Sequence, residues 1–282
     1  MGLRQMLPVQ MNRMVFIGEA RGKLRLPPGI VNGEFDRRLH LGATDEKLPP
    51  NIANRMQGLD DFQVVVERGP GLHTLSVPLV TMGANFGRRL VIVRGRDGCL
   101  ALLSPVGLTP DLHRQVSALG EIRLLIVPTD FHDGGVAAAR RQMEGAALLV
   151  SDGLMKLPGA MPLPTSLPGE LAAELLSIPI GGQPSVNETV FLHSATGLLL
   201  VSDLIFNFDH RWRGWSRLLF RIAGAYGGPK VSRLFRSCIR DRAAFRESIN
   251  AIPWSKVTGI VPSHGDCLFS ATERVERMLK AI

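Results

Sequence analysis

The sequence predicts one α/β (α+β) domain in which two groups of strands form a β-sandwich covered by helices on both outer faces. Short apolar runs punctuated by Gly, Pro and Asp fall into two groups along the chain. Amphipathic stretches with helical spacing lie between these groups and after them. Residues 122–150 follow the order strand, loop, helix, strand, which is typical of a βαβ unit. Helices on both outer faces follow because each apolar sheet face must be covered.

The composition is that of a globular protein with its own core. The chain has 282 residues, of which 45% are hydrophobic and 21% are charged. No apolar run reaches the roughly 18 residues of a membrane-spanning helix, and the N-terminus lacks the pattern of a secretory leader. The three cysteines are scattered, which favours a reducing compartment. We therefore expect a soluble, cytoplasmic protein.

The first 58 residues differ in pattern from the rest. Residues 1–58 are rich in Pro, Gly, Asn and charge, so we expect an extended N-terminal arm with one short strand near Met14 to Ile17. The domain is expected to span residues 59–282. Its opening strands, separated by turn residues, should pair as an antiparallel sheet. They are expected at Phe62–Glu67, Leu75–Val80, Leu90–Arg94 and Leu100–Leu103.

Helix signals separate this sheet from the second group of strands. Thr109 followed by Pro110 predicts a helix start, and Gly120 predicts the end of that helix. Near the C-terminus, Ser270 and Glu273 have the spacing of a capping box for a closing helix. The other elements are a helix from about Gly135 to Met143 and strands at Ile122–Val127, Ala147–Val150, Ser177–Ile180, Glu188–His193, Gly197–Ser202 and Lys256–Val261.

Metal-ligand residue types follow three of the expected strands. His132 and Asp133 come after the strand that ends at residue 127. Asp203 comes directly after residue 202, and His264 and Asp266 follow residue 261. Because a sheet can bring such strand ends to one edge, we expect a common site. Imidazole and carboxylate groups bind zinc or iron, and such an ion lowers the pKa of bound water to about 7. Asp266 is expected to orient the His264 imidazole or to join it in catalysis.

Seven short blocks between residue 62 and the C-terminus carry a family resemblance. They are Arg89-Leu-Val-Ile-Val, Cys99-Leu-Ala-Leu-Leu-Ser-Pro, Ala118-Leu-Gly-Glu-Ile, Phe191-Leu-His, Val201-Ser-Asp-Leu-Ile-Phe-Asn207, Arg233-Leu-Phe-Arg-Ser and Ser263-His-Gly-Asp266. Together they resemble the metallo-β-lactamase superfamily, and more narrowly its uncharacterised bacterial branch known as a domain of unknown function. The resemblance implies a four-layer αββα sandwich and a metal-dependent hydrolase in which Asp203 and His264 are metal ligands.

The ligand set departs from the pattern of that superfamily. Its metal-binding loop reads His-x-His-x-Asp-His, whereas residues 128–135 offer His132 flanked by Asp130 and Asp133. The middle histidine of the superfamily, expected just before the strand that begins at Glu188, is absent, because the chain reads Gly-Gly-Gln-Pro at residues 181–184. A two-metal centre uses about six or seven protein ligands, whereas this chain has three or four ligand-type residues at the matching positions. The sequence therefore predicts at most one Zn or Fe ion.

Two functions remain open on this pattern. The first is a hydrolase that uses His132 or Asp133, together with Asp203 and His264, to activate water against an ester, thioester, lactone or phosphodiester. The second is a non-catalytic protein of the same fold, with one metal ion or none, that binds a small acidic ligand or a protein partner. In that case His132 and Asp133 belong to a hydrogen-bonded capping loop and Asp203 belongs to a turn. His193, on a strand expected to be buried, is interpreted as a core residue.

Residues 211–250 are expected to form a helical cap inserted in the domain, and they hold much of the positive charge behind the net charge of +8. We expect a solvated basic face, with docking on an anionic membrane surface or an acidic partner as the alternative. Nucleic acid is disfavoured because aromatic residues are few and no binding motif occurs. The first helix places Arg213, Arg217 and Arg221 opposite a stripe expected to be buried, formed by Trp215, Leu218, Leu219 and Ile222. A second helix is expected to begin at Gly228 and Pro229.

Overall fold

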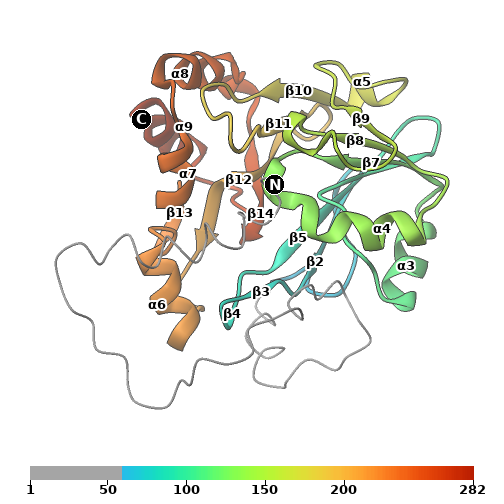
Figure 1. Ribbon diagram of the computed structural model, residues 1–282, viewed down its shortest axis with the longest axis horizontal. Coiled ribbons are helices and arrows are strands. Elements are labelled where there is room, and N and C mark those ends of the chain that lie inside the picture. The colour runs from blue at the N-terminus through green and yellow to red at the C-terminus, as the bar shows by residue number, and fades with distance from the viewer. Residues whose placement is uncertain (1–58) are drawn as a thin grey trace. The chain divides into compact units, whose positions relative to one another are not determined.

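Most strands of residues 59–282 belong to two sheets. The computed structural model describes residues 59–282, so the arm expected over residues 1–58 and its strand near Met14 to Ile17 lie outside the described residues. The larger sheet has seven strands in the order β1-β2-β5-β6-β7-β8-β9 (Figure 1). Its first four strands pair antiparallel, as the sequence predicts, and β6 to β9 pair parallel. The bounds are β1 (Val66–Gly69), β2 (Leu72–Val77), β5 (Arg88–Arg94), β6 (Leu100–Leu103), β7 (Ile122–Val127), β8 (Ala147–Val150) and β9 (Ala160–Pro162).

The second sheet has five strands. Its path is β10-β11-β12-β13, and β14 pairs parallel with β12. A separate hairpin joins β3 (Val80–Thr81) to β4 (Ala84–Asn85). The strands of the second sheet are β10 (Leu175–Pro179), β11 (Thr189–His193), β12 (Leu198–Phe208), β13 (Gly228–Lys230) and β14 (Gly259–Gly265).

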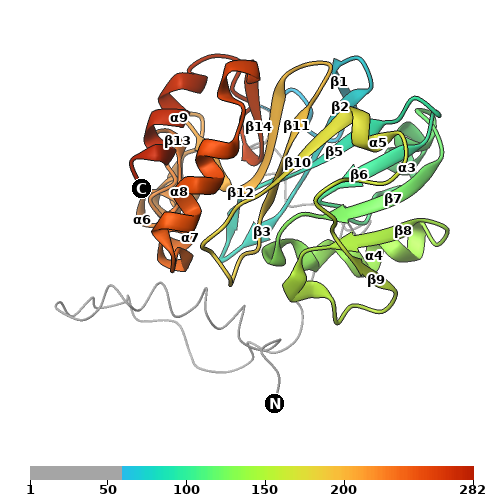
Figure 2. The same ribbon diagram turned by 90° about the horizontal axis from the view of Figure 1, so that it is seen from above.

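Helices lie beside both sheets (Figure 2). Three of the four apolar clusters of the described residues join the sheets to one another and to these helices. One cluster joins the seven-stranded sheet to α3 and α4. A second joins the five-stranded sheet to α7, α8 and α9. The third contains side chains from both sheets, among them Leu103 and Phe191. The helices are α3 (Pro110–Ser117), α4 (Val136–Gln142), α5 (Leu171–Glu174), α6 (Gly214–Ile222), α7 (Arg233–Cys238), α8 (Arg242–Ala251) and α9 (Thr272–Lys280), with 3₁₀ turns η3 (Asp130–Gly135), η4 (Asp152–Leu154) and η5 (Trp254–Lys256).

Strand β12 is longer than expected and is irregular in its middle. The sequence predicts that it ends at Ser202, whereas it continues to Phe208, so Asp203 lies within the strand. Its pairing with β14 passes from Val201 opposite Pro262 to Phe206 opposite His264. Over this step β12 advances five residues while β14 advances two. The surplus residues bulge out of the ladder, and Asp203 is one of them.

The orientation of α6 differs from the one that the sequence predicts. Leu219 and Phe220 are buried, but the rest of the expected stripe is exposed: Trp215 by 49%, Leu218 by 49% and Ile222 by 48%. The reason is an aromatic cluster under the helix, in which Phe220 stacks on Phe208 with ring centroids 3.9 Å apart. That contact turns the other apolar side chains outward.

Two other local expectations are wrong. The expected helix start at Gly228 and Pro229 is instead strand β13, which pairs with residues 206–208, and α7 begins at Arg233 with Ser232 as its cap. The expected capping box at Ser270 is not formed, because Ala271 adopts a left-handed φ of 66° and α9 begins at Thr272. The Thr109 cap of α3 is confirmed, since its hydroxyl accepts a hydrogen bond from the Leu112 amide. Within residues 59–282 no helix is long and apolar enough to cross a membrane.

Candidate metal centre

Three of the four expected metal ligands meet at one buried point. His132 lies in η3, Asp203 in the irregular part of β12 and His264 in β14. The two histidine Nε2 atoms are 3.3 Å apart. Nε2 of His132 lies 3.4 Å from Oδ2 of Asp203, and Nε2 of His264 lies 3.5 Å from Oδ1 of Asp203. His132, Asp203 and His264 as whole residues are 2%, 7% and 4% exposed. The convergence expected from the strand ends is present.

The spacing of these atoms fits a single metal ion. A tetrahedral zinc ion with bonds of about 2.0 to 2.2 Å keeps its ligand atoms about 3.3 to 3.6 Å apart. All three separations fall in this range. Oδ2 of Asp203 is also buried without a hydrogen-bond partner among the described residues. A buried polar atom without a partner is costly, and a cation would satisfy it.

Hydrogen bonds on the far sides of the two rings aim both Nε2 atoms at the centre. Nδ1 of His264 lies 2.6 Å from the carbonyl oxygen of Gly87, so Nδ1 donates its proton to that oxygen and Nε2 is the atom left to bind a metal ion. Nδ1 of His132 lies 2.8 Å from the Ser104 hydroxyl. Such partners fix the ring orientation of metal-bound histidines. Phe206 stacks on the His264 ring at 5.3 Å between centroids.

The charges in this region favour the metal-binding forms of the ligands. Burial lowers the pKa of His132 well below its ordinary value, and the nearby Arg88 lowers it further, so the ring is neutral. Burial by itself would raise the pKa of Asp203, but cationic surroundings, among them the charge of Arg88, hold it below its ordinary value. Neutral imidazole and ionised carboxylate are the protonation states that bind metal.

Two consecutive arginines hold the loops that carry the histidines. Nη2 of Arg88 donates to the carbonyl oxygen of His132 at 2.7 Å. Nη1 of Arg89 donates to the carbonyl oxygens of Pro262 and Gly265 at 2.6 and 2.8 Å, on either side of His264. Arg89 also forms a buried ion pair with Asp61, with Nε 2.6 Å from Oδ2. Both guanidinium groups are buried, and they attach the histidine loops to β5.

Glu188 is a buried carboxyl that the sequence reasoning did not select. Its two oxygens accept hydrogen bonds from the backbone amides of Ser202 and Asp203 at 2.8 and 3.0 Å. Burial and the neighbouring Asp203 raise its pKa to about 8. It holds the irregular part of β12 in place and so positions Asp203. The available signal was an ionisable residue at the start of an apolar strand that was expected to be buried.

Solved structures with a similar fold are metallo-β-lactamases. No protein-family model and no curated protein matches the chain. A metallo-β-lactamase from Pontibacter korlensis aligns with a TM-score of 0.54 at 15% identity, over 77% of this chain and 99% of that one. One from Erythrobacter litoralis aligns with a TM-score of 0.51 at 16% identity, over 77% and 92%. FIM-1 from Pseudomonas aeruginosa, in its mono-zinc form, gives 0.50 at 15%, over 77% and 94%. The described chain has the metallo-β-lactamase fold. At these identities the likeness concerns the fold alone.

The other two expected site residues lie outside the centre of this metallo-β-lactamase fold. Asp133 is exposed and does not belong to the His132, Asp203 and His264 group. Asp266 forms an ion pair with Arg211, and its expected role of orienting His264 is filled by the Gly87 carbonyl. The reason is the left-handed φ of 87° at Gly265, where the chain turns away from the centre after His264.

Two further residues named from the sequence have structural contacts. Asp130 faces away from the centre and accepts hydrogen bonds from the Ser151 hydroxyl at 2.6 Å and the Asn187 amide at 2.8 Å. It therefore fixes the loop that carries His132. His193 is buried in β11, where its Nδ1 lies 2.8 Å from the Thr196 hydroxyl. This placement agrees with the expected core role.

Proposed function

We propose that this protein is a metal-dependent hydrolase with one zinc or iron ion held by His132, Asp203 and His264. The observation that carries the proposal is the convergence of three ligand atoms from separate elements at 3.3 to 3.5 Å in a buried site. The proposal includes the four-layer αββα sandwich, which the three apolar clusters support. It assigns the chain to the uncharacterised bacterial branch of the family. It also includes a domain over residues 59–282 with a helical insertion at 211–250, and a cytoplasmic location.

A bound zinc or iron ion would supply a Lewis acid and a water of lowered pKa, which suits hydrolysis of an ester, thioester, lactone or phosphodiester. The residues of the chain supply two imidazole ligands, one carboxylate ligand and the contacts that orient them. Arg88, buried beside Asp203, keeps a positive charge in the site, since burial lowers its pKa only to about 10. A fixed positive charge next to the Asp203 carboxylate disfavours the binding of a second metal ion and suits a site with a single ion.

Metal analysis of the full chain, purified without chelator, tests this proposal. We expect about one metal equivalent in the unchanged protein and a loss of metal in His264→Ala and Asp203→Asn. Asp133→Asn, which changes an exposed carboxylate next to the centre, should keep its metal. Metal content that is unaffected by His264→Ala would reject the site.

Hydrolysis assays distinguish a catalytic metal ion from a structural one. A panel of aryl ester, thioester, lactone and phosphodiester substrates should give turnover that a chelator abolishes and zinc restores. The deep burial of the three ligands, each less than 10% exposed, favours a second candidate in which the same ion is structural. Bound metal without chelator-sensitive turnover of any of the four substrate classes would support that candidate and reject the hydrolase.

A further inference from the structure

Helix α6 presents an apolar face that no described element covers. Trp215, Leu218 and Ile222 are each about half exposed, and their spacing of three and four residues places them on one side of the helix. The opposite side, with Leu219 and Phe220, is buried. Nε1 of Trp215 donates to the Met82 carbonyl oxygen at 2.8 Å, which fixes the exposed indole ring in place.

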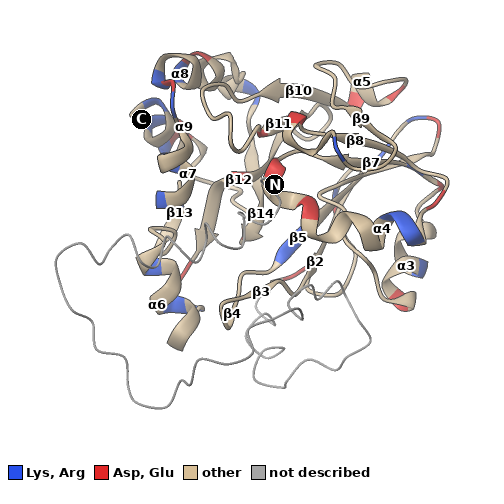
Figure 3. Ribbon diagram, viewed as in Figure 1, with Lys and Arg blue, Asp and Glu red and all other residues tan. Residues whose placement is uncertain are grey.

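Exposed arginines border this apolar face. Successive residues of a helix are 100° apart, which divides the surface of α6 into an exposed apolar side, a buried side and a third, basic side. Arg217 and Arg221 lie on this third side, next to Leu218. The insertion of residues 211–250 has ten Arg and Lys residues and two Asp and Glu residues, so its net charge of +8 equals that of the whole chain. Figure 3 shows Lys and Arg residues on α6, α7 and α8, which lie on the same side of the described residues, at the left of the view.

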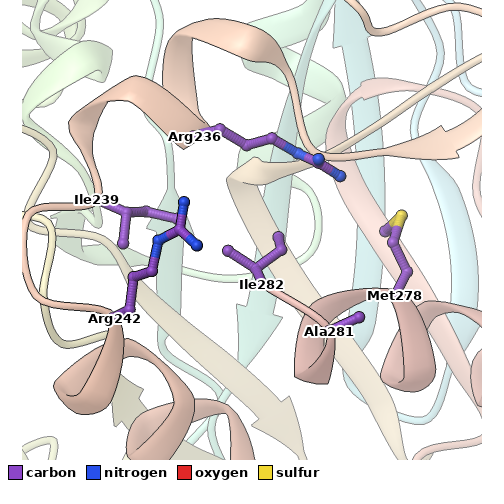
Figure 4. A pocket seen from close by; sticks show the side chains of 6 residues that line it. All are labelled: Arg236, Ile239, Arg242, Met278, Ala281 and Ile282. Atoms are coloured by element: carbon purple, nitrogen blue, oxygen red, sulfur yellow. The ribbon is translucent and has the colours of Figure 1, made fainter.

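A hollow near the other end of the insertion has the same combination of groups. The cavity, of about 310 Å³, lies between α7, the start of α8 and the end of α9 (Figure 4). Arg236 and Arg242 face Ile282 and Met278 across it. Arginine side chains therefore lie beside apolar side chains in this hollow, as they do on α6.

We propose that α6 is a docking surface for an anionic lipid bilayer. Apolar side chains with a Trp among them, bordered by arginines, are the pattern of a helix that lies in the membrane interface. Trp215, Leu218 and Ile222 would enter the acyl boundary, and Arg217 and Arg221 would reach the lipid phosphates. A second copy of the chain fits this surface poorly, because the same positive charge would face itself across the interface.

Vesicle flotation with the full chain tests the proposal. We expect binding to vesicles of phosphatidylcholine with phosphatidylserine, none to phosphatidylcholine alone, and release at about 1 M salt, where the Debye length is about 3 Å. Arg217→Gln with Arg221→Gln should weaken binding about 30-fold, because each arginine near an anionic surface strengthens it about fivefold. The control removes two exposed arginines from α3 and α4, Arg114→Gln with Arg141→Gln, and should change binding much less.

The apolar contribution has a matched control. Leu218→Ser should weaken binding about fivefold, whereas Leu176→Ser, which removes a leucine of 48% exposure from β10, should leave it unchanged. Brominated lipid should quench the tryptophan fluorescence of the unchanged protein and have little effect in Trp215→Phe. Absence of binding at low salt overturns the proposal, as does an equal effect of the two leucine variants. A dimer that Leu218→Ser dissociates, or tighter binding to polyglutamate than to vesicles, also overturns it.

Discussion

At the scale of single residues, Arg88 and Arg89 decide where the two histidines stand. Neighbouring residues of a strand point to opposite faces, so one arginine reaches the His132 loop and the other reaches the loop around His264. Burying two guanidinium groups is costly unless their donors are satisfied. Carbonyl oxygens and Asp61 satisfy those of Arg89. The centre therefore depends on side chains that are not metal ligands.

Replacing Arg89 with Met is expected to destabilise the fold by about 3 kcal/mol. Breaking a buried ion pair costs about 3 to 5 kcal/mol, and Arg68, 3.5 Å from the same Asp61 carboxylate, leaves part of the charge paired. Urea unfolding of the metal-free protein measures the loss. Arg96→Met is the control, because it breaks an ion pair whose arginine is 72% exposed and should cost less than about 1 kcal/mol. Equal losses in the two variants would show that the Arg89 contacts are not important for stability.

His193 is expected to make stability depend on pH. Burial lowers its pKa below the ordinary 6.5, so between the folded-state and unfolded-state pKa values the unfolded chain binds more protons. Stability is therefore complete above about pH 6.5 and falls as the pH drops below it, by at most about 1.4 kcal/mol per pH unit. In His193→Gln the contribution of His193 is absent, so the total loss of stability on acidification should be smaller than in the unchanged protein.

Urea unfolding at about pH 7.5 and about pH 5.5, with chelator present, measures the difference. The pKa values of His73 and His132 are also lowered, mainly by burial, but both residues are present in both proteins, so their effects cancel in the comparison. The same loss of stability between the two pH values in His193→Gln and in the unchanged protein would rule out this role for His193.

At the scale of elements, α6 and β12 show what the sequence pattern can and cannot predict. The pattern correctly predicts a helix after residue 211, but apolar residues cover two of its three sides, and only the contact of Phe220 with Phe208 selects the buried one. β12 was expected to end where Asp203 interrupts the apolar run, whereas Glu188 binds the backbone there and the strand continues. Both errors arise from contacts between residues far apart in the chain.

Adjacent leucines of α6 should differ widely in their effect on stability. Leu219 is 6% exposed and Leu218 is 49% exposed. Leu219→Ala is therefore expected to cost about 2 to 5 kcal/mol, because it leaves a cavity in the core. Leu218→Ala should stay within about 0.5 kcal/mol of the unchanged protein. Chemical denaturation of the two variants decides between this orientation of α6 and the one expected from the sequence, which buries both.

At the scale of the whole molecule, the candidate centre joins the two sheets. His132 follows β7 of the seven-stranded sheet, while Asp203 and His264 belong to the five-stranded sheet. Because ligand-type residues at strand ends gather at a sheet edge, the sequence could predict this meeting across 132 positions. It could not choose between His132 and the neighbouring Asp133, because that choice depends on the kink at His132, where φ is −103° and ψ is 27°. The roles of Arg88 and Glu188 depend on contacts that no local pattern contains.

Because its ligands come from both sheets, a bound ion should stabilise the whole fold. An ion that binds only the folded state adds about 2.7 kcal/mol at a free concentration 100 times its Kd, and for a domain of this size that raises the Tm by about 5 to 11 °C. Calorimetry with and without zinc should show this rise in the unchanged protein and in Asp133→Asn. Asp203→Asn should show none, because the shared carboxylate is lost. A rise that persists in Asp203→Asn would place the stabilising ion elsewhere in the chain.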